Sequence, residues 1–93
     1  MDKASLIVPF GKIQMEFIED TVWFHAQADK WSPSIYKESL DSWLAIIEFC
    51  KVNGYKYIAS HIPDDNKIRK FQTLFGLEPY AETEHGLVFR MEI

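Results

Sequence analysis

Histidine and cysteine are the residue types in this chain that could do chemistry near neutral pH, since their side chains titrate there or form reactive thiolates. The sequence contains three histidines and one cysteine. His25 and His61 fall in stretches that predict strands, whereas His85 lies in the turn sequence EHG. A strand histidine can act as a general base, or it can be a half-buried residue with a hydrogen-bonded ring. Both interpretations stay open for His25 and His61, and His85 is predicted to be a solvated turn residue.

Cys50 lies in an apolar helical pattern and has no second cysteine with which to pair. It is either a buried small hydrophobe or a reactive thiol. The histidines and Cys50 lack close metal-ligand spacing, and the Asp64-Asp65 pair is better explained as a helix cap than as paired catalytic carboxylates. The sequence therefore predicts no metal site.

The net charge, the hydrophobic pattern and the cysteine content indicate which partners and which cellular compartment to expect. The formal net charge is −4, so an electrostatic footprint for nucleic acid is not expected. No stretch approaches the roughly 20 apolar residues of a membrane span. A lone cysteine is typical of a reduced compartment. We therefore expect a soluble, cytoplasmic protein that binds neither nucleic acid nor membrane.

The elements that must position these residues follow from hydrophobic periodicity and from turn and cap residues. At 93 residues, with 47% hydrophobic and 15% aromatic content, the chain can bury one core, so we expect a single domain over residues 1–93. The long helix between the third and fourth strands allows a parallel crossover, which predicts an α+β fold with a mixed sheet and two helices packed on it. The expected order is β-β-β-α-β-α-β-β, with strands at 4–8, 12–18, 21–28, 55–62, 77–83 and 87–93, a helix from Pro33 to Asn53, and a helix from Asp64 or Asp65 to Gly76.

The first helix is expected to pack on the sheet through a stripe of apolar residues three and four positions apart. This stripe consists of Tyr36, Leu40, Trp43, Leu44, Ile47 and Cys50.

The second helix and its flanks carry a pattern of greater specificity. The sequence DNKIRKFQTLFGL resembles the N-x-x-A-x-x-F-Y-x-x-x-G-F pattern of the GNAT superfamily of N-acetyltransferases, in which this helix lies beside the pantetheine of acyl-CoA. The order of elements extends the resemblance over residues 21–93. The matched positions are Asp65 at the Asn, Ile68 at the Ala, Phe71 at the Phe, Gly76 at the Gly and Leu77 at the last Phe, and Asn66 matches the Asn if one residue is deleted.

Two departures from the GNAT pattern concern catalysis and phosphate binding. Gln72 stands where many members place a Tyr that acts as the general acid, and an amide cannot fill that role, although Tyr57 or Tyr80 could substitute. The glycine-rich loop that cradles the CoA pyrophosphate is replaced by DKWSPSIYK, which contains no glycine. Two serines and a lysine at that helix start could hold an anion weakly, or could merely cap and solvate the helix; they are Ser32, Ser34 and Lys37.

A third departure is length, since the 20 residues before Thr21 leave no room for the two helices that shape the acceptor site in the family. The resemblance then implies one of two functions. The first is a minimal acetyl-CoA-dependent N-acetyltransferase, completed by a homodimer, with His25 or His61 as the base.

The second function, which the departures favour, is a scaffold that needs no cofactor and binds another protein, as in small GNAT-like bacteriophage proteins of the virion or directed at the host. The chain would then act in the host cytoplasm or in the virion. Trp23 and Trp31, expected near the sheet edge and the helix entrance, are candidate anchors for a partner or members of the core.

Overall fold

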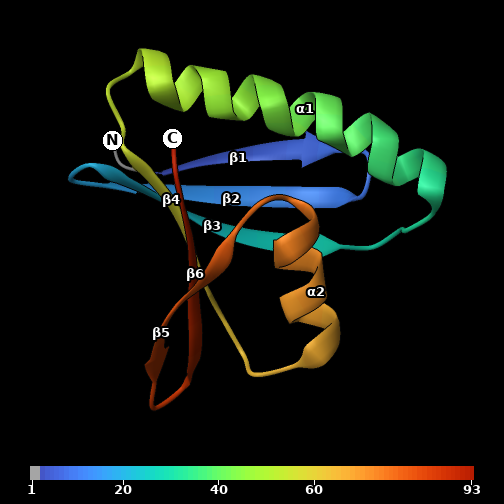
Figure 1. The fold of residues 1–93 in the computed structure, drawn as a ribbon. Helices are drawn as coiled ribbons and strands as arrows, with labels where there is room; N and C mark the ends of the chain where they lie inside the picture. Colours follow the sequence, from blue (N-terminus) through green and yellow to red (C-terminus); the bar gives the residue numbers. More distant parts are fainter. Residues whose placement is uncertain (1–2) are drawn as a thin grey trace.

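The structure is a computed structural model that describes residues 3–93, and its elements follow the predicted order (Figure 1). The α+β prediction is confirmed, and the observed boundaries differ from the expected ones by one or two residues at most ends. The elements are β1 (Lys3–Val8), β2 (Gly11–Ile18), β3 (Thr21–Ala28), α1 (Pro33–Val52), β4 (Tyr57–Ile62), α2 (Asn66–Leu74), β5 (Glu78–Thr83) and β6 (Gly86–Glu92).

The strands form one mixed six-stranded sheet in the order β1-β2-β3-β4-β6-β5. All neighbouring pairs are antiparallel except β3 and β4, which are parallel because α1 connects them as a crossover (Figure 1). Trp23 therefore lies on an inner strand, and its expected place near the sheet edge is wrong. Which strands lie inside the sheet depends on their order in space, which the order of elements along the chain does not give.

Both helices cover the same face of the sheet, which we call the helix face. The rings of Phe24 on β3 and Trp43 on α1 lie 5.1 Å apart, and the Trp43 indole N–H donates a 2.8 Å hydrogen bond to the carbonyl of Phe75 at the end of α2. The opposite face, which we call the open face, has no helix on it within residues 3–93. The two faces follow from the two-residue alternation of each strand.

Helix α1 begins where the sequence predicts. The Ser32 hydroxyl accepts a hydrogen bond from the Ile35 N–H at 3.2 Å, and Pro33 occupies the first turn, where a missing N–H is tolerated. The predicted stripe is wrong at Leu44, which is 60% exposed, while Ser39 and Ile46 are buried instead. Leu44 lies 100° round the helix from Trp43, outside the buried arc.

Helix α2 is capped by Asp65, which resolves the predicted choice between two aspartates. Its carboxylate accepts hydrogen bonds from the N–H groups of Lys67 at 2.9 Å and Ile68 at 3.1 Å. The helix ends before Gly76, whose φ of +90° lies in the left-handed region that favours glycine. Phe71 and Phe75, with ring centroids 5.1 Å apart, join α2 to the core.

The described helices, α1 and α2, include none with the length and apolar character needed to cross a membrane.

Candidate functional site: a cleft between two diverging strands

The cleft arises because β3 and β4 pair over only part of their length. Parallel pairing joins Thr21 with Tyr57 and continues to Trp23 with Ala59. Beyond that point β3 stays paired with β2 alone and β4 with β6 alone, so the two strands part (Figure 1). The space between their ends, closed on one side by α2, is a cleft of about 670 Å³ that residues of both sheet faces reach.

His25 and His61 both line this cleft, one from each diverging strand, and both side chains are exposed. They also line a second groove of about 460 Å³ on the open face, together with Trp23 and Glu16. The structure thus brings the two candidate bases to one place. His85 lies in the β5–β6 turn, away from the cleft lining.

His61 is held by the β5–β6 hairpin. Its Nε2 lies 2.8 Å from the Thr83 hydroxyl, and that hydroxyl donates to the Gly86 carbonyl at 3.2 Å. Either atom can be the donor in the bond between His61 and Thr83, depending on the tautomer of the imidazole. If Nε2 carries the proton, Nδ1 of neutral His61 carries the free lone pair and is the atom that could accept a proton. Among residues 3–93, the cleft lining contains no Asp or Glu that could orient either ring.

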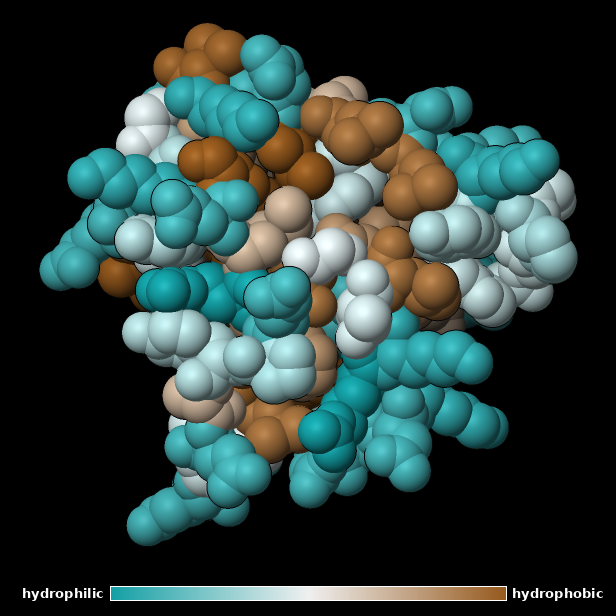
Figure 2. Space-filling view, in the orientation of Figure 1, coloured by the Kyte–Doolittle hydropathy of each residue, from teal (hydrophilic) through white to brown (hydrophobic). Residues whose placement is uncertain are grey.

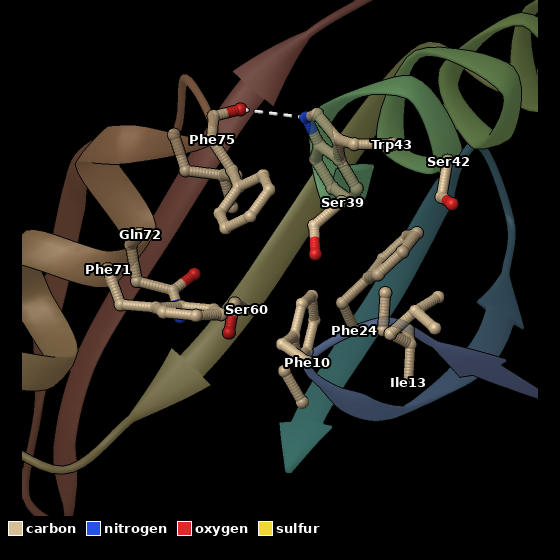
Figure 3. Close-up of a pocket in the computed structure, with 13 residues that line it drawn as sticks. Phe10, Ile13, Phe24, Ser39, Ser42, Trp43, Ser60, Phe71, Gln72 and Phe75 are labelled. Carbon is tan, nitrogen blue, oxygen red and sulfur yellow. Dashed lines mark hydrogen bonds between the residues drawn. The ribbon is translucent and has the colours of Figure 1, made fainter. Parts of the chain in front are cut away.

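The cleft borders a small chamber beneath α1, which several aromatic rings line (Figure 3). The cleft and the chamber share Ser60, Phe71 and Gln72 as lining residues. The chamber has a volume of about 30 Å³, enough for a water molecule. The Ser39 hydroxyl, which points into it, is buried and has no hydrogen-bond partner within residues 3–93.

Gln72, at the family's acid position, is buried with 8% of its surface exposed, and its side chain lies in the chamber beside Ser60 (Figure 3). The two tyrosines that could substitute lie elsewhere. Tyr57 and Tyr80 flank Arg90, whose guanidinium carbon is 4.2 Å and 3.8 Å from their ring centroids, and neither tyrosine lines the cleft. The cleft therefore lacks a phenol that could act as an acid.

The candidate anion-binding residues cap the start of α1. The Ser32 hydroxyl bonds the Ile35 N–H and lies 3.2 Å from the Ser34 hydroxyl, while the Lys37 side chain is exposed. None of the three lines the cleft. Trp31, the residue before the cap, lines it instead and packs on Phe71 with ring centroids 5.3 Å apart.

The candidate residues at the start of α2 are also engaged locally. Asp65 uses its carboxylate to cap the helix, and Asn66 is the first helical residue; neither lines the cleft. The next residue, Lys67, does line it and is its basic residue. Sequence reasoning missed Lys67 and also Ser39, because no local pattern distinguishes them from other helix residues.

Cys50 is buried, as one of its two interpretations predicted. Burial raises the pKa of its thiol, because the thiolate would lose its hydration. This disfavours the reactive form. Within residues 3–93, no group of three or more His, Cys, Asp or Glu residues is arranged to hold a metal ion.

No protein-family model matches the chain, and no curated protein matches it. A solved structure does share the fold: the crystal structure of a domain from Methanocaldococcus jannaschii DSM 2661, at 14% sequence identity and a TM-score of 0.66. The match covers 90% of this chain and 56% of that chain, so this chain spans a little over half the length of the domain it resembles.

Proposed function

We propose that the chain is a GNAT-like domain with a degenerate acyl-CoA site, which acts without a cofactor by binding another protein. The observation that supports this proposal is that few backbone N–H groups are free at the N-terminus of α1, where GNAT proteins hold the CoA pyrophosphate. Pro33 has no N–H, the Ile35 N–H bonds the Ser32 hydroxyl, and the Tyr36 N–H bonds the Ser32 carbonyl. Of these first helical residues, only Ser34 keeps an N–H for a phosphate.

The catalytic position supports the same conclusion. Gln72 cannot donate a proton as an acid, and its side chain is buried at the wall that the cleft and the chamber share. Its amide suits a structural role beside Ser60. A departing thiolate would find no acid there.

The partner is expected on the open face. Both helices pack on the helix face, and the groove on the open face combines an aromatic ring, Trp23, with the imidazoles of His25 and His61 and with both signs of charge, from Lys3 and Glu16. Such a mixed surface suits a polypeptide better than a polyanion. By its size and acidity the chain is similar to GNAT-like bacteriophage proteins, so we place it in the virion or in the host cytoplasm, acting in assembly or on a host protein.

A second candidate function is favoured by the cleft itself. The parting of β3 and β4 opens a space that His25 and His61 both line, and the Thr83 hydroxyl holds the His61 ring through a 2.8 Å hydrogen bond with Nε2. In a minimal N-acetyltransferase, acetyl-CoA would enter this cleft and one of the two histidines would deprotonate the amine acceptor.

Titration calorimetry with acetyl-CoA distinguishes the two functions. The binding-protein proposal expects no heat of binding and no thermal shift at millimolar ligand. Saturable binding at micromolar ligand would overturn it. In that case His25→Ala or His61→Ala should abolish acetyl transfer, while His85→Ala, outside the cleft, should leave it unchanged.

The proposed binding of a protein partner at the open face has its own test. A partner captured by the wild-type chain should be lost with Trp23→Ala and kept with Leu44→Ala, an exposed residue on the other side of the molecule. Equal capture by both variants would contradict an open-face site.

A further inference from the structure

The two outer strands of the sheet differ in how they are protected against pairing with another chain. An outer strand exposes a row of unpaired backbone donors and acceptors, which native proteins usually block with charge, proline or a bulge. Strand β5 has all three, since it contains Glu78, Pro79 and Glu82 and its pairing with β6 is irregular between Pro79 and Ala81. This edge is closed to further pairing.

Strand β1 has none of these features along residues 4–8. The run Ala-Ser-Leu-Ile-Val contains no charge and no proline, and its register with β2 is regular from Lys3 with Glu16 to Val8 with Gly11. Leu6 is 40% exposed and Ile7 is 82% exposed. Within residues 3–93, β1 has a strand neighbour on one side only.

We propose that β1 pairs in an antiparallel manner with β1 of a second copy of this chain, so that the two sheets become one continuous sheet across a two-fold axis. Antiparallel strands exchange hydrogen bonds between opposite residues, and a two-fold axis perpendicular to the sheet puts residues of the same face opposite one another. With the axis at Leu6, Leu6 meets its own counterpart and Ala4 meets Val8 of the second copy on the helix face, while Ser5 meets Ile7 of the second copy on the open face.

The charges around this edge fit a second copy. The chain carries a net charge of −4, which opposes self-association in general. Beside β1, however, the register places Lys12 opposite Ile7 and Lys3 opposite Glu16, with a Lys3–Glu16 distance of 3.8 Å. Glu16 is the ion-pair partner of Lys3, and residues 4–8 of β1 carry no charge, so two such edges can pair along this run without burying a charge.

The pairing does not rest on the proposed function, although the two surfaces are neighbours. Strands β2 and β3 separate β1 from the cleft, whereas Lys3, Ala4 and Ser5 of β1 line the open-face groove. A partner in that groove would therefore lie beside the paired β1 strands.

Helix α1 offers the rival surface for self-association. Leu44, Phe49 and Val52 on α1 are exposed by 60%, 54% and 76%, and Figure 2 shows hydrophobic side chains reaching the surface along this helix. Any test must therefore separate β1 from α1.

Sedimentation velocity over a wide range of protein concentration is the test. We expect a dimer that dissociates on dilution. The double variant Ser5→Lys/Ile7→Lys, which puts like charges across the two-fold axis, should raise the dimer dissociation constant by at least about tenfold. The matched control Leu44→Lys/Val52→Lys adds the same charge on α1 and should leave the dimer intact. A monomer at every concentration, or a dimer that only the α1 variant dissociates, would overturn the proposal.

Hydrogen exchange on the wild-type chain gives a second readout that needs no substitution. The backbone amides of β1 should become more protected as protein concentration rises, whereas those of β5, the blocked edge, should not change. Protection of β1 that is independent of concentration would contradict pairing with a second copy.

Discussion

The two faces of the sheet are built from the same strands and the same alternation of side chains. Within residues 3–93, however, helices cover only one of them. On the helix face, Phe10 packs on Phe71 of α2 and Phe24 packs on Trp43, which is 7% exposed. On the open face, Trp23 is half-buried and Ile7 and Ile18 are exposed. The buried aromatic packing therefore lies on the helix face, whereas the open face is the one that we propose for recognition.

The largest expected effect compares the two tryptophans. Trp43→Ala should lower the free energy of unfolding by about 3–5 kcal/mol, since it removes a buried ring from the helix face. Trp23→Ala should lower it by about 1–2 kcal/mol, because the ring is still partly in water. Urea denaturation monitored by circular dichroism measures both. Equal losses would show that the open face belongs to the core.

Trp43→Phe sharpens this comparison. It keeps an aromatic ring but removes the N–H that bonds the Phe75 carbonyl at 2.8 Å. The carbonyl would be left unsatisfied, so we expect a loss of about 1–2 kcal/mol in the same denaturation experiment.

A smaller loss of stability is expected when the N-cap of α2 is removed. Asp65→Ala removes the acceptor of two backbone N–H groups and should destabilise the protein by about 1 kcal/mol. Its neighbour provides the control: Asp64 makes an exposed ion pair with Arg69 at 3.3 Å, and Asp64→Ala should change stability by less than about 0.5 kcal/mol. Equal effects in chemical denaturation would contradict the assignment of Asp65 as the cap.

The smallest change in stability is expected for Ser39, whose hydroxyl is buried between α1 and the sheet. The Ser39 hydroxyl is buried without a partner, so Ser39→Ala should leave stability unchanged or raise it by up to about 1 kcal/mol. A clear loss of stability by denaturation would instead indicate that a water molecule in the chamber bonds this hydroxyl.

Local elements were predictable because their signals act within a few residues. Ser32 bonds the Ile35 N–H and Asp65 bonds the Ile68 N–H, so sequence neighbours placed the cap of α1 and narrowed the cap of α2 to Asp64 or Asp65. Gly76 likewise marked the end of α2. The prediction failed at Leu44, because which arc of a helix is buried depends on how the helix lies across the sheet.

The candidate site was predictable only in part. His25 and His61 were chosen by residue type, and the structure brings them to one cleft. Trp31 and Lys67 were not assigned to that cleft, since they join it only when the start of α1 and the first turn of α2 close on the same strand ends.

The sequence alone determined the order of the elements, the cap of α1 and the alternation of apolar residues, because these depend on contacts between near neighbours in the chain. The tertiary structure decided which face of the sheet is covered, where β3 and β4 part, and which strands remain outermost. Those properties depend on strand order and helix packing between residues far apart in the sequence, where no local pattern acts.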